Sequence, residues 1–172
     1  MKSFLFFAAI TLASFFSVEA QEIIKIEDQI GAKPVVKMTL NGKKIWVLLD
    51  TGASVNLLDI KVQKKYDFGV YNRPGNSVNV VGFASSEMEL SRVDGIDLRY
   101  QGIRLKDEFL AHDLTDVVNS VKQESMITIS GIIGYSMMRK YGFVIDMGKD
   151  VAVLSYKKKK MRKPKCSDSN YK

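Results

Sequence analysis

The sequence of 172 residues contains one cysteine, Cys166, and one histidine, His112. A single thiol cannot form a disulfide within the chain, so no cross-link is available to stabilise the fold. A lone histidine without neighbouring cysteines does not provide the ligands of a zinc site. It also gives no Ser–His or Cys–His pair of the kind that nucleophilic hydrolases use. We therefore predict no metal site and no cofactor.

Long apolar runs are scarce too, and the one near the N-terminus has roughly 15 residues. Lys2 precedes this run, and small residues follow it up to Ala20. The pattern is typical of a secretory signal peptide that is cleaved after Ala20. We expect residues 1–20 to be a signal peptide and the protein to be exported, either periplasmic or secreted. An uncleaved signal anchor stays open as the alternative, although a membrane span needs about 20 apolar residues.

Acidic residues are nearly absent from the C-terminal segment, residues 157–172, which holds eight Lys or Arg and one acid, Asp168. The body between residues 21 and 156 has seventeen basic and seventeen acidic residues. A like-charge run of this kind is usually disordered, and it either stays solvated or contacts an anionic surface. Nucleic acid is a poor candidate partner, because composition reveals no basic face in the body. We expect one domain over residues 21–156, followed by a basic, disordered tail.

The body reads as mostly β. Apolar-rich runs with strand character are separated by turn signals, of which Asn41-Gly42 is the strongest. Further hairpin turns are expected at residues 100–102, 82–86 and 147–149. Short helices are expected at Leu58–Tyr66 and at Tyr135–Tyr141, the second flanked by glycines. The segment from Leu114 to Ser130 reads as a polar loop. Many short strands with regular turns predict a small barrel or a sandwich.

One carboxylate stands out in the stretch WVLLDTGASVNLL, where Asp50 directly follows an apolar run. A carboxylate among apolar neighbours is unfavourable unless it has partners or reaches water. Asp50 therefore marks either an ordinary turn or a functional site.

A second segment, GIIGYSMMRKYGFVID, follows about eighty residues later. Asp50-Thr51-Gly52-Ala53 and the later Ile132-Ile133-Gly134, in this order, resemble the motifs of the retropepsin-like aspartic proteases, the family of retroviral proteases and their bacterial relatives. The resemblance implies an all-β fold, a small closed barrel of the acid-protease type with one or two short helices. It also implies that Asp50 is catalytic. The implied supporting residues of the active site are Thr51, Gly52, Ala53, Ser54, Ile132, Ile133 and Gly134. The implied flap over the substrate has Gly82, Phe83, Ala84 and Ser85 at its tip.

The sequence has only one Asp-Thr-Gly, and the chain is too short for a two-lobed enzyme. In such enzymes two carboxylates share a proton and activate a water molecule. The missing carboxylate would come from a second copy, so the resemblance implies a homodimer with Asp50 from each chain. The implied substrate is an extended peptide or protein bound like an added strand. The sequence thus predicts an aspartic endopeptidase. A catalytically silent module of the same fold, which binds peptides or envelope components, stays open as the alternative.

Overall fold

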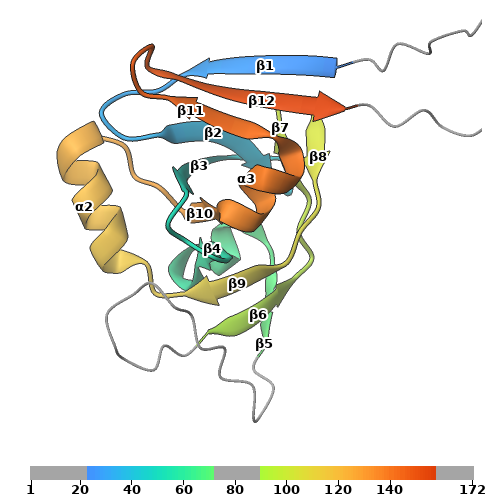
Figure 1. Ribbon diagram of the computed structural model, residues 1–172. Helices are drawn as coiled ribbons and strands as arrows, with labels where there is room; N and C mark the ends of the chain where they lie inside the picture. Colours follow the sequence, from blue (N-terminus) through green and yellow to red (C-terminus); the bar gives the residue numbers. More distant parts are fainter. Residues whose placement is uncertain (1–22, 72–89, 158–172) are drawn as a thin grey trace, which may run out of the picture.

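A computed structural model of the protein describes residues 23–71 and 90–157 (Figure 1). The larger sheet has nine strands in the order β5-β6-β9-β4-β10-β3-β2-β7-β8, and the smaller has three in the order β1-β12-β11. In chain order the strands are β1 (Ile23–Gln29), β2 (Val35–Leu40), β3 (Lys43–Asp50), β4 (Asn56–Asp59), β5 (Gly69–Tyr71), β6 (Ser91–Asp94), β7 (Leu98–Tyr100), β8 (Ile103–Leu105), β9 (Phe109–His112), β10 (Gly131–Gly134), β11 (Phe143–Asp146) and β12 (Val151–Lys157). The helices are the 3₁₀ turn η1 (Ile60–Val62), α1 (Gln63–Tyr66), α2 (Thr115–Ser125) and α3 (Tyr135–Tyr141).

The predicted all-β class is confirmed, but the expected closed barrel is wrong for the part of the chain that the structure describes. The larger sheet starts at β5 and ends at β8, and each of these edge strands pairs on one side only. The smaller sheet runs beside β2 at one side of the molecule (Figure 1).

The turn chemistry predicted the hairpins well. β2 and β3 pair in antiparallel fashion through Leu40 and Lys43, and Asn41 and Gly42 between them have φ angles of 49° and 78°. Two positive φ angles give a turn whose twist matches that of the flanking strands. The β7–β8 and β11–β12 hairpins also form at the expected places. The hairpin expected at residues 82–86 lies outside the described residues.

Of the two expected helices, α3 forms over the predicted range. It ends at Gly142, whose φ of 66° places it in the left-handed region that favours glycine after a helix. The segment predicted as helix from Leu58 starts instead as strand β4 and becomes helical only in η1 and α1.

The polar loop expected between Leu114 and Ser130 is wrong, because its first part forms α2. Val121 follows Val117 by four residues and Val118 by three, so the three valines share one face of a helix. That face packs against buried side chains of the sheet. Burial of this short apolar stripe outweighs the polar composition of the rest of the segment.

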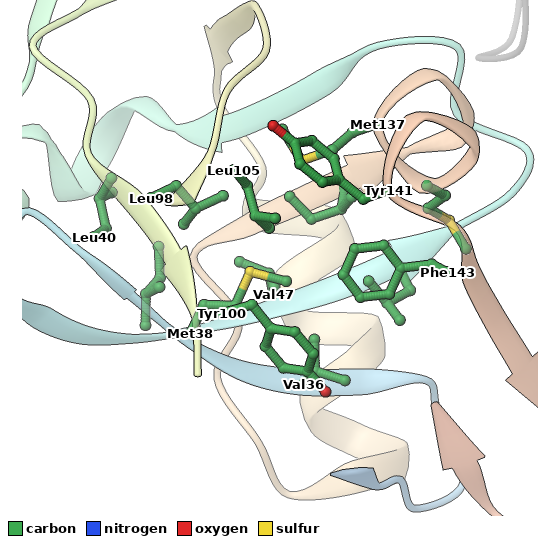
Figure 2. Packing of buried hydrophobic residues seen from close by; sticks show 14 of the residues in the cluster. Val36, Met38, Leu40, Val47, Leu98, Tyr100, Leu105, Met137, Tyr141 and Phe143 are labelled. Atoms are coloured by element: carbon green, nitrogen blue, oxygen red, sulfur yellow. The ribbon is translucent and has the colours of Figure 1, made fainter. Parts of the chain in front are cut away.

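The main core lies between the two sheets and α3. Figure 2 shows apolar side chains of β2 and β3 meeting those of β7, β8, α3 and β11. The Tyr100 and Phe143 rings lie 5.6 Å apart between centroids, so they join the larger sheet to the smaller one. Among residues 23–71 and 90–157, no helix has both the length and the apolar character to span a membrane.

Candidate active site

Strand β3 carries Asp50 at its C-terminal end. Along this strand Ile45, Val47 and Leu49 are buried in the core, whereas Trp46, Leu48 and Asp50 are only partly buried. The alternation follows the two-residue period of a strand, so Asp50 projects on the face opposite the main core. The strand therefore holds the carboxylate on a rigid support and leaves it partly accessible.

The loop after Asp50 folds back on its carboxylate. The Gly52 N–H donates to Asp50 Oδ1 at 2.8 Å, and the Ala53 N–H donates to the Asp50 carbonyl at 3.3 Å. Ala53 is buried, whereas Thr51, Gly52 and Ser54 are exposed. The loop thus orients the carboxylate from one side and presents small, exposed residues on the other.

The structure brings the two sequence motifs side by side. β10 lies parallel to β3, and Gly134 is aligned with Asp50. β10 also pairs with β4 in antiparallel fashion, so it lies between the strand that precedes the Asp50 loop and the strand that follows it. Ile132 and Ile133 are fully buried, and they anchor this central strand on both faces of the sheet.

Gly134 lies where the two motifs approach most closely. A Cβ atom at this position would lie 2.4 Å from the Val55 carbonyl oxygen and 2.8 Å from the Ala53 carbonyl oxygen. The next residue, Tyr135, donates its N–H to the Ala53 carbonyl at 2.8 Å. Only a glycine allows the backbone of β10 to pack against the Asp50 loop at this distance.

The sequence matches the aspartyl protease family over residues 36–137, a range that includes the strand of Asp50, its loop and all of β10. The chain belongs to the aspartyl protease family. No curated protein matches it.

Solved structures resemble this family member in fold. A retropepsin-like aspartic protease from Rickettsia conorii gives a TM-score of 0.50 at 18% identity, covering 80% of this chain and 94% of that chain. The retroviral protease-like domain of Ddi1 from Leishmania major gives a TM-score of 0.47 at 14% identity, covering 74% of this chain and 94% of that chain. EIAV protease in complex with the inhibitor HBY-793 gives a TM-score of 0.41 at 22% identity, covering 64% of this chain and 88% of that chain. The predicted resemblance to retropepsin-like aspartic proteases is confirmed.

Sequence reasoning missed one polar residue of the site in this aspartyl protease-family protein. Asn56, at the start of β4, is only 2% exposed. Its Oδ1 accepts from the Gly134 N–H at 3.0 Å, and its Nδ2 donates to the Glu108 carbonyl at 2.9 Å. The available signal was a polar amide directly before Leu57 and Leu58, since a polar residue in a buried run needs hydrogen-bond partners.

Helix α2 covers the sheet next to the site (Figure 1). Leu114, just before the helix, shares a buried cluster with Ala53 and Ile132, against which Val117 and Val118 also pack. The helix thereby supports the Asp50 loop through Ala53. The predicted flap residues Gly82, Phe83, Ala84 and Ser85 lie outside the described residues. Among the described residues, no group of three or more His, Cys, Asp or Glu side chains is placed to hold a metal ion.

Proposed function

We propose that this protein is an aspartic endopeptidase whose active site is completed by a second copy of the chain, with Asp50 contributed by each. The observation that carries the proposal is the setting of Asp50. It is the carboxylate of the only Asp-Thr-Gly in the chain, it is held at the end of a rigid strand, and the loop beside it is exposed.

The chemistry follows from two carboxylates that share one proton. The ionised carboxylate takes a proton from a water molecule, whose oxygen attacks the carbonyl carbon of the scissile peptide bond. The protonated carboxyl donates its proton to the carbonyl oxygen, which gives a neutral tetrahedral intermediate. Collapse of this intermediate breaks the C–N bond. The leaving nitrogen receives a proton from the protonated carboxyl of the dyad, while a hydroxyl of the intermediate gives its proton to the ionised carboxylate. The dyad is thus regenerated without any cofactor.

The exposed loop supports a symmetric dimer. Thr51 and Gly52 face solvent, and neither has a bulky side chain that would keep a second loop at a distance. In an isologous dimer the same surface of each chain meets itself, so one loop of this kind in each chain can form a paired site. The Gly52 N–H would orient the Asp50 carboxylate in each half of the pair.

The substrate we propose is an extended peptide or an unfolded protein, which pairs with backbone groups as an added strand. The proposed location is the periplasm or the extracellular space, with residues 1–20 removed. The basic segment at residues 157–172 would then face an anionic surface or remain in water.

The test uses residues 21–172, an extended-peptide library and the variant Asp50→Asn. The wild type should cleave and pepstatin should inhibit it, whereas Asp50→Asn should be inactive with unchanged circular dichroism. Equal amounts of the two chains should be mixed and allowed to exchange subunits at a fixed total concentration. If heterodimers are inactive, random pairing leaves about one quarter of the wild-type activity, whereas independent monomers would leave about one half. Cleavage by Asp50→Asn would contradict the proposal, and binding without cleavage by the wild type would support the silent module.

A further inference from the structure

Asn56 is the first residue of β4 and comes shortly after the Asp50 loop. Its side chain is almost completely withdrawn from water, and the following Leu57, Leu58 and Asp59 are buried as well. A primary amide in such a place retains its hydrogen-bonding requirements, with an oxygen that accepts and a nitrogen that donates. Its partners therefore determine which segments it can join.

The two partners belong to segments that are distant in sequence. Gly134, whose N–H donates to the Asn56 oxygen, is 78 residues away, and Glu108, whose carbonyl accepts from the amide nitrogen, is 52 residues away. Gly134 ends β10, and Glu108 immediately precedes β9. The amide thus ties the end of β10 to the start of β9, which lies parallel to β4.

The bond to Gly134 reaches Asp50 through a short series of contacts. Gly134 is aligned with Asp50 across the β3–β10 pair. The neighbouring Tyr135 N–H binds the Ala53 carbonyl in the loop, and the Gly52 N–H binds the Asp50 carboxylate. Two consecutive N–H groups at the β10–α3 junction therefore bind the segment that follows Asp50. The Tyr135 N–H binds a backbone carbonyl of the loop, and the Gly134 N–H binds the side chain of Asn56.

We infer that Asn56 is a positioning residue for the reaction: it fixes the Asp50 loop against β10, so that the carboxylate is held in place for its counterpart in the second chain. The inference rests on the proposed function. The role requires an asparagine, because leucine has neither the acceptor nor the donor and aspartate lacks the donor to Glu108. Misplacement of a reacting group by about 1 Å can lower a rate about 100-fold.

The first test does not depend on activity. Amide hydrogen exchange would be measured by NMR for the wild type, Asn56→Leu and Asn41→Asp. Asn41 is a matched control, because its amide also joins separate segments, donating to the carbonyls of Tyr66, Asp67 and Gly95. In Asn56→Leu we expect the Gly52, Gly134 and Tyr135 amides to exchange about tenfold faster, with the β1–β12 amides unchanged. Asn41→Asp should leave the three site amides as in the wild type.

The second test measures kinetics on a cleaved peptide at a temperature where each variant is fully folded. Asn56→Leu should lower kcat about 10- to 100-fold while KM changes less than about twofold, since the loss affects the chemical step rather than peptide binding. Asn56→Asp keeps an oxygen that can accept from the Gly134 N–H, so its kcat should fall less than that of Asn56→Leu. Asn41→Asp should keep the wild-type kcat.

The outcomes separate this inference from the proposed function. If the wild type cleaves no peptide, the proposed function fails, while the exchange pattern still decides whether Asn56 holds the loop. Unchanged exchange at Gly52 in Asn56→Leu would overturn the inference. Uniformly faster exchange across all strands would overturn it too, because it would mean that Asn56 contributes only to global stability. If Asn56→Leu does not fold, Asn56→Asp takes its place in the exchange test, with the Gly52 amide as the readout.

Discussion

Gly134→Ala is the substitution for which the geometry makes the sharpest prediction. The added methyl group would lie 2.4 Å from the Val55 carbonyl oxygen and 2.8 Å from the Ala53 carbonyl oxygen. Both obstacles are backbone atoms, so no side chain can rotate away to make room. Either β10 or the Asp50 loop must move by several tenths of an ångström or more.

The expected cost can be bounded from the same contacts. Forcing an extra carbon into a well-packed interior costs about 1–3 kcal/mol. The displacement also strains the hydrogen bonds from Tyr135 N–H to the Ala53 carbonyl and from Gly134 N–H to Asn56, each of which contributes about 1 kcal/mol. We expect a loss of about 2–4 kcal/mol in the free energy of unfolding, and for a domain of this size each kcal/mol lowers Tm by about 2–4 °C.

The assay is urea unfolding followed by circular dichroism, with Gly31→Ala as the matched control. A Cβ atom at Gly31 would meet no atom within 4 Å, and its φ is not positive, so alanine there should be neutral or stabilising by less than about 1 kcal/mol. Within the proposed function, Gly134→Ala should also lower the peptidase activity under conditions where the variant is still folded, because the strain falls on the Asp50 loop. A Gly134→Ala midpoint equal to that of the wild type would refute the close approach of the two motifs.

Three further predictions concern the scaffold. Asn41→Asp should destabilise the protein by about 1–3 kcal/mol in urea unfolding, because the carbonyls of Tyr66 and Gly95 lose their amide donor; an unchanged midpoint would contradict this. Tyr141→Phe should lower the free energy of unfolding by about 1–3 kcal/mol, because the phenol hydroxyl accepts from the N–H of Lys106 and donates to its carbonyl. The measurement is Tm, and a Tm equal to that of the wild type would contradict the prediction. The hydrogen bond from Thr115, helped by Lys61, lowers the pKa of Asp113 from 3.8 to about 2. Because the folded-state pKa of Asp113 is depressed, its contribution to the free energy of unfolding should be full above about pH 4 and should disappear as the pH falls through 2. The difference in the free energy of unfolding between the wild type and Asp113→Asn should therefore shrink over that range.

The local features of the fold could be predicted because they depend on few neighbouring residues. Asn41-Gly42 specifies its turn through the φ angles that these two residues tolerate. Gly142 marks the end of α3 for a similar reason, whereas Gly134 at its start is required by the close approach of the Asp50 loop. The placement of Asp50 beside Gly134 could also be anticipated, but only through resemblance to a family, since nothing local links segments about eighty residues apart.

Features that depend on tertiary contacts escaped prediction. α2 forms because Val117 and Val121 find an apolar surface on the sheet, and that surface is not visible in the segment itself. The role of Asn56 depends on Gly134 and Glu108, whose proximity follows from the sheet order rather than from spacing.

The pairing of distant strands also governs when the site can come into existence. β3 meets β10 only after the chain has been made as far as Gly134, and the smaller sheet joins the first described strand to the last, with Ile23 opposite Lys157. Contacts of such long range form late in folding, because a long loop must be closed before they contribute stability. A nascent chain that ends before residue 131 therefore has the Asp50 loop but no β10 to hold it. Within the proposed function, the chain acquires its hydrolytic capacity only after residues 131–134 have been made and have paired with β3.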